Sequence, residues 1–492
     1  MNFDSEPAGP RVRPARVQQR ERLVSPVIDQ VAVLTDTAPV PTGERRFPSD
    51  FRWGVATAAY QIEGSTTEDG RGRSIWDTFA RTPGRVHLGH TGDVACDHYR
   101  RYRHDVALMR ELNVGTYRFS VAWPRIVPDG TGPANSRGLD FYDRLVDTLM
   151  ETGINPMVTL YHWDLPQALE EHGGWTNRRT AYHFADYARV VHARLGDRVR
   201  TWTTLNEPWC SAFLGYASGE HAPGRTDPVA AFAALHHLLL GHGLAAGAMR
   251  SAGAREVSIA LNLTPVSPRD PEDRHDLEAV RIIDGLQNRI FLDPLLRGAY
   301  PEDLQPILER FNALRHQLPG DAAQIAAPLD LLGVNYYQRQ VVTTSAIPGA
   351  ALVATRPTDT PLTAMGWGLD PGGLGDLLRR VHREYGDLPL YVTENGAAYV
   401  DEVSSDGAVH DPERTAYIAA HLDSCASAIA DGVPLRGYFV WSLLDNFEWA
   451  HGYSKRFGVV HVDYATQQRR VKDSGRWYAD FIRTHRARQA EG

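Results

Sequence analysis

The sequence contains few cysteines, and their spacing argues against two kinds of site. Cys96, Cys210 and Cys425 are the three cysteines of the 492-residue chain, odd in number and far apart. This spacing matches neither a disulfide framework nor the paired ligands of a structural zinc site. It is typical of buried thiols in a reducing compartment, and we therefore expect a cytoplasmic location.

Lysine is scarce as well. Lys455 and Lys472 are the only lysines, so nearly all of the 52 basic side chains are arginine. The 60 acidic side chains outnumber them, which gives a net charge of −8 and an isoelectric point near 6.2. A mildly acidic protein does not attract nucleic acid phosphates. The composition therefore argues against a nucleic acid as the partner.

No uninterrupted apolar stretch is long enough to indicate a membrane span. The longest candidate, Val229–Met249, lacks Asp, Glu, Lys and Arg but contains His236, His237 and His242. This composition predicts a buried amphipathic helix instead. The three histidines have no acidic partner at ligand spacing, so we expect neither a metal nor another cofactor.

The chain divides into three parts by pattern. Residues 1–45 contain Pro, Arg, Asp, Glu and Val without a clear period, and no apolar segment of signal-peptide length, which indicates a disordered N-terminal leader. Residues 46–485 follow one repeating pattern, and residues 486–492 form a short C-terminal tail. The whole chain is 42% hydrophobic, which is enough to bury one large core or two medium ones.

Within the middle part, β-rich runs alternate with amphipathic helical patterns. The eight runs are Phe51–Gln61, Gly115–Val121, Asn155–His162, Arg200–Glu207, Glu256–Leu261, Leu329–Asn335, Pro389–Glu394 and Gly437–Leu443. Alternation of this kind implies right-handed β-α-β units and a parallel sheet. Eight units predict a single α/β domain, a (β/α)8 TIM barrel with enlarged βα loops. One such loop is the polar, Pro-rich stretch Thr343–Pro361.

A doubly wound open sheet is the alternative fold. That fold binds nucleotides through a Gly-x-Gly-x-x-Gly turn after its first strand, and no such turn follows Phe51–Gln61. The barrel is therefore the preferred prediction.

Two of the runs have the same construction. Leu388–Gly396 is a β-rich stretch that ends in Thr-Glu-Asn-Gly, and Arg200–Pro208 ends in Asn-Glu-Pro. Each places one acid, Glu394 or Glu207, at the carboxyl end of a buried strand, where α/β proteins expose reactive groups. A single acid at a strand end is more often a capping or ion-paired residue. Two acids on separate strand ends supply what glycoside hydrolysis requires.

Most of the other strand ends also carry hydrogen-bonding or stacking groups, which converge on one pocket in a barrel. They are Gln61, Arg118, His162, Trp163, Asn206, Asn335, Tyr336, Tyr337 and Trp441. The chemistry needs one acid protonated and the other ionised. Arg118 is the candidate for lowering the pKa of the ionised acid, and the phenol of Tyr337 for donating a hydrogen bond to it. Neither a metal-ligand set nor a phosphate-binding loop emerges.

From residue 47 to residue 483 the sequence resembles glycoside hydrolase family 1, the β-glucosidase type. The motifs that carry the resemblance are Phe51–Gly64 (FRWGVATAAYQIEG), Tyr117–Arg125 (YRFSVAWPR), Tyr161–Pro166 (YHWDLP), Thr204–Pro208 (TLNEP), Tyr391–Gly396 (YVTENG), Trp441–Trp449 (WSLLDNFEW) and Arg456–Gly458 (RFG). The resemblance implies a barrel enzyme that retains anomeric configuration, with Glu207 as general acid/base and Glu394 as nucleophile. Asn206 would hold the sugar 2-hydroxyl.

The resemblance also implies a set of substrate contacts. Gln61, His162, Glu448 and Trp449 would bind the remaining hydroxyls, Trp441 would stack under the sugar ring, and Trp163 would also belong to the substrate-binding residues. Asn335 and Phe457 would complete the inner shell, and Trp367 would lie on the leaving-group side. The stretch Trp367–Pro371 departs from the family, which usually has Glu after this Trp. The resemblance therefore does not determine which aglycone the protein prefers.

Two positions narrow the substrate class. Phospho-glycosidases of the family carry Ser and Lys where this chain has Glu448 and Trp449, and myrosinases replace the acid with Gln where it has Glu207. The expected substrate is a small, unphosphorylated O-linked β-D-glucoside or cello-oligosaccharide, as in cellulose degradation, with β-galactosidase or β-fucosidase side activity. Two other hypotheses are a transglycosylase that uses the same two glutamates and an inactive sugar-binding protein. A homo-oligomer is compatible with the sequence.

Overall fold

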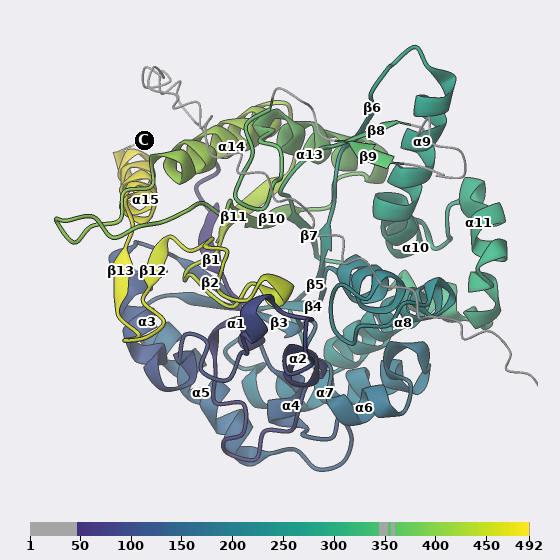
Figure 1. The fold of residues 1–492 in the computed structure, drawn as a ribbon, viewed down its shortest axis with the longest axis horizontal. Helices are drawn as coiled ribbons and strands as arrows, with labels where there is room; N and C mark the ends of the chain where they lie inside the picture. Colours follow the sequence, from purple (N-terminus) through teal and green to yellow (C-terminus); the bar gives the residue numbers. More distant parts are fainter. Residues whose placement is uncertain (1–46, 344–352, 356–359, 492) are drawn as a thin grey trace, which may run out of the picture. The chain divides into compact units, whose positions relative to one another are not determined.

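The computed structural model describes residues 47–343, 353–355 and 360–491. In this part of the chain, eight parallel strands close into a barrel in the order β1-β11-β10-β7-β5-β4-β3-β2 (Figure 1). Their bounds are β1 Arg52–Ala56, β2 Thr116–Ser120, β3 Asn155–Tyr161, β4 Thr201–Asn206, β5 Glu256–Asn262, β7 Leu331–Asn335, β10 Leu390–Asn395 and β11 Leu435–Trp441. Each of the eight predicted runs overlaps one of these strands, and the ends of β5, β10 and β11 differ by one or two residues from the predicted ones. The predicted barrel is confirmed, and the open-sheet alternative is wrong.

Helices surround the barrel (Figure 1). The longest are α3 His98–Glu111, α5 Ser136–Glu151, α7 Arg179–Leu195, α8 Pro228–Ser251, α13 Pro371–Tyr385, α14 Pro412–Ala430 and α15 Asp473–Glu491. The shorter ones are α1 Ala59–Ile62, α2 Ile75–Ala80, α4 Trp123–Ile126, α6 Gln167–Glu171, α9 Arg274–Asp284, α10 Ile290–Arg297, α11 Gln305–Arg310 and α12 Asp321–Ile325. The segments α9 to α12 all lie between β5 and β7, where the βα connection is most enlarged.

Three of the long helices, α8, α13 and α14, begin at an Asp-Pro pair, and in the first two the Asp side chain caps the helix. The Asp227 side chain accepts from the backbone N–H groups of Val229 and Ala230 at the start of α8. The Asp370 side chain likewise accepts from Gly373 N at 3.0 Å at the start of α13. The Asp satisfies N–H groups that lack a partner within the helix, and the Pro that follows has the φ angle of the first helical turn. Local sequence therefore fixes where α8 and α13 begin.

Helix α8 is the helix predicted from the long apolar stretch. By length and composition it is the one helix among the described residues that is able to cross a membrane, and 89% of its most apolar window is buried inside the protein. The prediction of a buried helix is confirmed, but the helix is not amphipathic. It is buried around most of its circumference because it packs against α7, α12 and the segment Cys210–Ser218.

Two small sheets flank the barrel. Strand β12 (Val460–Val462) pairs antiparallel with β13 (Arg469–Val471), and β8 (Gln340–Thr343) pairs with β6 (Val266–Pro268) and β9 (Val353–Thr355). Strand β9 falls within Thr343–Pro361, which was predicted to be a loop throughout. That prediction is wrong for β9. The sequence pattern gave no sign of the backbone hydrogen bonds that join β9 to β8. Residues 344–352 and 356–359 of the stretch lie outside the described residues.

The proposed leader, residues 1–45, also lies outside the described residues. At the other end of the chain, helix α15 ends at Glu491. Residues 486–491 of the predicted C-terminal tail therefore belong to this helix.

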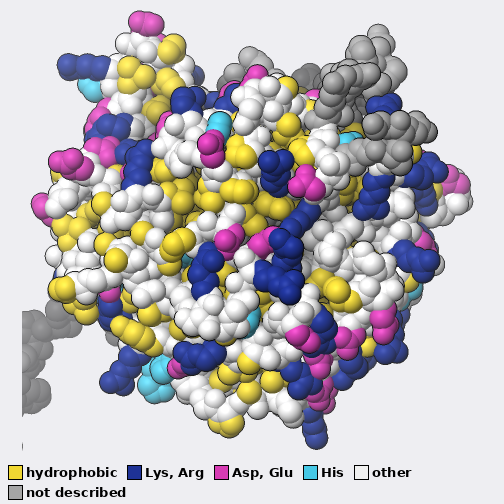
Figure 2. All heavy atoms as spheres, turned by 180° about the vertical axis from the view of Figure 1, so that it is seen from behind, with side chains coloured by type: hydrophobic (Ala, Val, Ile, Leu, Met, Phe, Trp, Pro, Cys, Tyr) yellow, Lys and Arg dark blue, Asp and Glu magenta, His cyan; other side chains and the backbone are white. Residues whose placement is uncertain are grey.

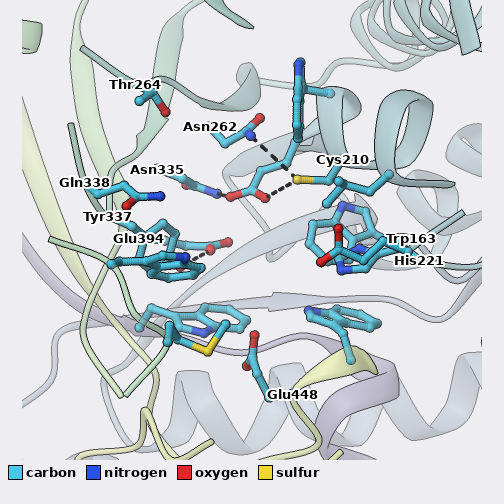
Figure 3. Close-up of a pocket in the computed structure, with 18 of the residues that line it drawn as sticks. Trp163, Cys210, His221, Asn262, Thr264, Asn335, Tyr337, Gln338, Glu394 and Glu448 are labelled. Atoms are coloured by element: carbon cyan, nitrogen blue, oxygen red, sulfur yellow. Dashed lines mark hydrogen bonds between the residues drawn. The ribbon is translucent and has the colours of Figure 1, made fainter. Parts of the chain in front are cut away.

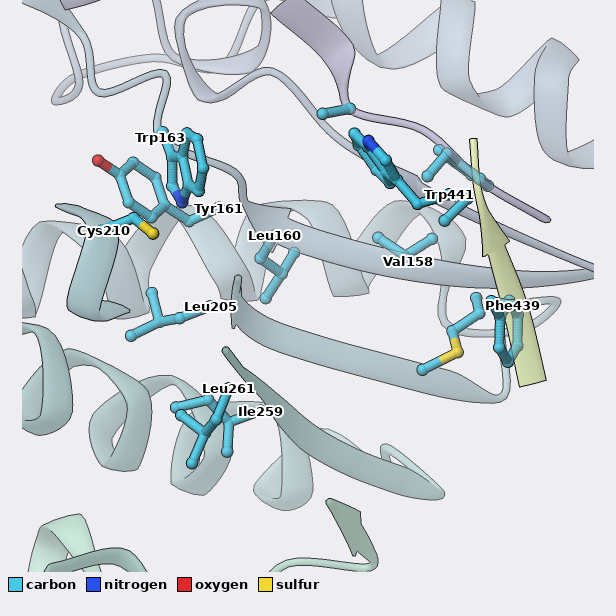
Figure 4. Close-up of a cluster of buried hydrophobic side chains, with 14 of the residues drawn as sticks. Val158, Leu160, Tyr161, Trp163, Leu205, Cys210, Ile259, Leu261, Phe439 and Trp441 are labelled. Carbon is cyan, nitrogen blue, oxygen red and sulfur yellow. The ribbon is translucent and has the colours of Figure 1, made fainter. Parts of the chain in front are cut away.

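The core between strands and helices is apolar, and Figure 4 shows one part of it, with Val158 and Leu160 from β3, Leu205 from β4 and Ile259 from β5. Hydrogen bonds also join the two layers: the Tyr187 hydroxyl on α7 donates to the carbonyl of Leu160 at 3.0 Å. On the face of the molecule turned away in Figure 1, basic and acidic side chains are interspersed (Figure 2).

Candidate active site

A cavity of about 460 Å³ lies at the carboxyl ends of the barrel strands (Figure 3). Its wall contains most of the predicted site residues: His162, Trp163, Glu207, Asn335, Tyr337, Trp367, Glu394, Trp441, Glu448, Trp449 and Phe457. Gln61, Arg118 and Asn206 are fully buried directly behind this wall. Residues that are far apart in the chain therefore meet at one cavity, as the strand-end rule predicts.

Glu394 is the fifth residue of β10, and the strand end after it is firmly anchored. The amide of Asn395 donates to the carbonyl of Tyr336 at 2.8 Å and its oxygen accepts from the Tyr438 hydroxyl at 2.6 Å. A Cβ atom at Gly396 would lie 1.7 Å from the carbonyl oxygen of Trp441, so this turn requires glycine. The Thr-Glu-Asn-Gly sequence thus fixes where the Glu394 side chain points.

Two donors bind the Glu394 carboxylate. Arg118 Nη1 lies 2.6 Å from Oε1, and the Tyr337 hydroxyl donates to Oε2 at 2.7 Å. Both predicted partners of Glu394 are therefore in place. Arg118 was predicted at a strand end, which is wrong: it is the third residue of β2, and its long side chain crosses the barrel interior. Its neighbours Tyr117 and Phe119 stack on each other on the opposite face of the strand.

Glu207 follows the last residue of β4 and has a positive φ of 46°. Its backbone N–H donates to the carbonyl of Ala260 at 2.9 Å. Asn335 Nδ2 donates to its Oε1 at 2.7 Å, and the Cys210 thiol donates to its Oε2 at 3.2 Å (Figure 3). Trp163 and Trp449, in the same cavity wall, also have positive φ. Such backbone strain clusters at functional sites.

The two carboxyls experience different electrostatic environments. Burial, reinforced by repulsion from Glu394, raises the pKa of Glu207 to about 8, and its donors are only a neutral amide and a thiol. Burial also raises the pKa of Glu394, but the Arg118 guanidinium and the Tyr337 phenol oppose that shift. Glu394 is therefore the carboxyl that ionises first, while Glu207 keeps its proton at neutral pH.

A chain of side-chain amides links the two acids. Asn206 Oδ1 accepts from Arg118 Nη2 at 2.6 Å and from Asn335 Nδ2 at 3.0 Å. The Thr393 hydroxyl donates to Asn335 Oδ1 at 2.6 Å, so the NH₂ group of Asn335 must face Glu207. The side-chain nitrogen of Asn206, Nδ2, lies 3.1 Å from His162 Nε2. The positions of the two carboxyls are thus coupled through residues on four strands.

Gln61 was predicted at the end of the first strand, and this is wrong. Strand β1 ends at Ala56, and Gln61 lies on the short helix α1. Its amide nitrogen donates to Asn446 Oδ1 at 3.0 Å, to the Phe447 carbonyl at 2.9 Å and to Glu448 Oε2 at 3.3 Å. The helical turn carries Gln61 to the loop after β11, so that it still reaches the predicted site.

Aromatic rings line two sides of the cavity. The rings of Trp163 and Trp449 have centroids 4.5 Å apart, and Trp441 stacks near His162 at 5.7 Å. On the other side, Trp367 lies 5.3 Å from Tyr337 and 6.1 Å from Phe457, so it belongs to the cavity wall. Flat aromatic faces next to buried hydrogen-bonding groups provide surfaces for sugar rings.

Several lining residues were not predicted from the sequence. They are Trp209, Cys210, Leu214, Glu220, His221, Asn262, Leu263, Thr264, Gln287, Gln338, Gln340, Met365 and His451. Asn262 carried a usable signal: it is the last residue of β5, but the predicted strand stopped at Leu261. Cys210 also carried one, because it lies one helical turn after Glu207. Gln287 and Met365 come from long connections, where no local pattern marks a cavity residue.

Among the described residues, no group of three or more His, Cys, Asp or Glu side chains is arranged to hold a metal ion. The three histidines of α8 form hydrogen bonds with three separate partners. His236 pairs with the Asp321 carboxylate, His237 with the Trp175 carbonyl, and His242 with the Thr204 hydroxyl.

Fold and site together define a class of protein, the barrel enzymes that cleave glycosidic bonds with a pair of carboxyls. Within that class the chain belongs to glycosyl hydrolase family 1, whose model matches residues 43–487.

Similar proteins span almost the whole chain. It is 52% identical over 473 residues to thermostable β-glucosidase B of Thermobispora bispora, covering 95% of this chain and 96% of the relative. A bifunctional β-D-glucosidase/β-D-fucosidase of Bifidobacterium breve is 49% identical over 464 residues, which are 90% of this chain and 99% of the relative. The crystal structure of a psychrophilic β-glucosidase from Micrococcus antarcticus aligns with a TM-score of 0.88 at 52% identity, covering 89% of this chain and 98% of that one.

Proposed function

We propose that this protein is a retaining β-glucosidase that hydrolyses unphosphorylated O-linked β-D-glucosides and cello-oligosaccharides by double displacement. The observation that carries the proposal is the unequal environment of the two carboxyls. Glu394 accepts from a guanidinium and a phenol, whereas Glu207 accepts from a neutral amide and a thiol. The relatives are named as β-glucosidases, which supports glucose as the glycone of the substrate. The relative named as a bifunctional β-D-glucosidase/β-D-fucosidase supports β-fucosidase side activity.

In the first step, Glu394 attacks the anomeric carbon while Glu207 donates its proton to the glycosidic oxygen. The bond from the anomeric carbon to that oxygen breaks, the aglycone leaves with the proton, and a glycosyl ester of Glu394 forms. In the second step, Glu207 removes a proton from water, which displaces Glu394. Each step inverts the anomeric carbon, so the product retains the configuration of the substrate. This mechanism requires carboxyls about 5 to 5.5 Å apart.

Asn206 is assigned the sugar 2-hydroxyl, whose hydrogen bond strengthens in the transition state. Arg118 and Tyr337 hold the Glu394 carboxylate, and Asn335 holds Glu207. Because Arg118 also donates to Asn206, the group that binds the sugar and the group that attacks it share one anchor.

Gln61, His162, Glu448 and Trp449 are assigned the other glycone hydroxyls. Gln61 Oε1 and His162 Nδ1 are buried polar atoms with no hydrogen-bond partner among the described residues, as expected of groups that bind a ligand. Trp441 and Trp163 supply aromatic faces. Asn335 and Phe457 border the same space, and Trp367 is assigned to the aglycone side, where Asn262, Thr264 and Gln338 offer further polar groups (Figure 3).

A phosphorylated substrate is disfavoured by charge. Glu448 shares the cavity with Glu207 and Glu394, and burial together with their charges raises the pKa of Glu448 to about 8. A phosphate at the sugar 6-position would bring further negative charge to the same enclosed space.

The first prediction concerns specificity and stereochemistry. Aryl β-D-glucosides are expected to be hydrolysed with the β-anomer of glucose as the first product observed by NMR, and the 6-phosphorylated analogues to react at least about 10²-fold more slowly. Aryl β-fucosides and β-galactosides serve as comparison substrates. An α-anomer as first product, or preference for the phosphorylated sugar, would contradict the proposed function.

The second prediction concerns Tyr337→Phe. The Tyr337 hydroxyl stabilises ionised Glu394, so its loss raises the pKa of Glu394 and moves the acidic limb of the kcat/KM profile to higher pH. We expect kcat/KM at neutral pH to fall about tenfold. The matched control Tyr182→Phe removes an exposed hydroxyl on α7 and should leave the profile unchanged. A shift of the basic limb alone would contradict the role assigned to Tyr337.

A cytoplasmic location is also proposed. It is supported by the three free, buried cysteines.

A further inference from the structure

Cys210 lies in the cavity wall and contacts Glu207 twice. Its backbone N–H donates to the Glu207 carbonyl at 3.0 Å, and its Sγ lies 3.2 Å from Glu207 Oε2. The residue is buried, and it starts the π-helical segment Cys210–Ser218 that follows β4. The thiol is therefore held beside one chosen oxygen of the carboxyl (Figure 3).

A third residue determines which way the thiol points. Asn262 Nδ2 donates to Cys210 Sγ at 3.6 Å. Asn262 is itself fixed as the last residue of β5, and its backbone carbonyl accepts from Gln287 Nε2 at 3.2 Å. Because the sulfur accepts from Asn262, the S–H hydrogen remains available for Glu207 Oε2.

The other oxygen of Glu207 has a different kind of partner. Oε1 accepts from Asn335 Nδ2 at 2.7 Å, and Thr393 fixes the orientation of that amide. An NH₂ group donates only, so a proton on the Asn335 side of Oε1 would face another hydrogen. A thiol, in contrast, is a weak donor that can rotate away. A proton on Oε2 of Glu207 would therefore not face a donor hydrogen that is held in place, whereas a proton on Oε1 would.

We propose that Cys210 is a positioning residue for Glu207, whose thiol marks Oε2 as the oxygen that carries the catalytic proton. The weak S–H donor holds the ionised carboxylate in place after proton transfer, yet stabilises that form too little to remove the proton beforehand. A hydroxyl in the same place would stabilise the ionised form more strongly. This inference rests on the proposed role of Glu207 as general acid/base.

The test compares wild type, Cys210→Ser and Cys210→Ala. The substrate is phenyl β-D-glucoside, whose leaving group needs a proton, and kcat/KM is measured against pH. The basic limb reports loss of the proton from Glu207. In Cys210→Ser the stronger donor favours the ionised form, so we expect the limb to move to lower pH by about half a unit. In Cys210→Ala the donor is lost, and the limb should move to higher pH by a similar amount.

Opposite shifts in the two variants distinguish tuning of Glu207 from a general packing role, which would lower activity without moving the limb in two directions. Cys425→Ala, which deletes the thiol of another buried cysteine on α14, should keep the wild-type profile. An unmoved limb in both variants, or shifts in the same direction, overturns the proposal. If Cys210→Ala fails to fold, the test rests on Cys210→Ser alone. A basic limb of that variant that stays in place or moves to higher pH contradicts the proposed role of Cys210.

The outcome can be separated from that of the proposed function. Glu207→Ala tests the general acid/base directly through its dependence on leaving group. If that variant behaves as expected and the Cys210 variants do not shift, only the role of Cys210 fails. If Glu207→Ala loses activity equally on all leaving groups, the proposed function fails and the role of Cys210 fails with it.

Discussion

Replacement of Glu394 by alanine is expected to reduce turnover of β-glucosides by at least about 10⁴-fold, equal to ~5 kcal/mol of transition-state stabilisation. The variant lacks the group that attacks the anomeric carbon, so no glycosyl ester forms. Arg118 and Tyr337 lose their shared acceptor at the same time. Steady-state rates on an aryl β-D-glucoside measure the loss.

Two comparisons keep this result interpretable. Glu394→Gln keeps one acceptor oxygen for Arg118, while its NH₂ group can donate to the Tyr337 hydroxyl oxygen. This variant therefore separates the chemical loss from any effect of removing the hydrogen-bond acceptor of a buried guanidinium. Glu151→Ala removes an exposed carboxyl at the end of α5 and should retain wild-type turnover. Circular dichroism checks the fold of each variant. Near-normal rates in a folded Glu394→Ala or Glu394→Gln would refute the assignment of the nucleophile.

Replacement of Glu207 by alanine is expected to have an effect that depends on the leaving group. A dinitrophenolate leaves without a proton, so the first step on its β-glucoside should be nearly unaffected. Phenol or an alcohol needs the proton of Glu207, and we expect kcat/KM on such substrates to fall about 10³-fold. The ratio of rate constants across a series of aryl β-D-glucosides measures this dependence.

The second step of the same variant offers an independent readout. Glu207 no longer activates water, so the glycosyl ester accumulates, and an anionic nucleophile that needs no base should restore turnover. Azide is small enough for the space left by the carboxyl, and β-glucosyl azide is the expected product. Equal losses on all leaving groups, or no azide product, would contradict the acid/base role of Glu207.

The barrel could be predicted because its signals are local. Most of the strands are short β-rich runs that end at or next to a polar group, and local signals also mark helix starts, as with Asp227 before α8. The pairing of β9 with β8 could not be predicted in the same way, because the hydrogen bonds that define it lie between segments. The insertion between β5 and β7 likewise gives no signal of which of its residues reach the cavity.

The site could be predicted as a set of residues but not as an arrangement. Glu207 and Glu394 stand out because each lies at the carboxyl end of a strand, one residue after the last residue of β4 and one residue before the last residue of β10. Arg118 reaches Glu394 from the middle of β2, and Gln61 reaches Glu448 from a helix, and both distances depend on how the barrel closes. Asn262 was missed because a strand end was placed one residue early. The difference in pKa between the two acids follows from burial and partners, which only the assembled fold supplies.

The central claim is that Glu394 forms a covalent bond to the sugar while Glu207 transfers the proton. A 2-deoxy-2-fluoro-β-D-glucoside with a dinitrophenolate leaving group slows hydrolysis of the ester, so that the intermediate can be digested and its peptides weighed. The account predicts that the peptide containing Glu394 gains the mass of one 2-fluoroglucosyl group as activity is lost. A label on any other residue, or hydrolysis that proceeds with no labelled peptide, would contradict it.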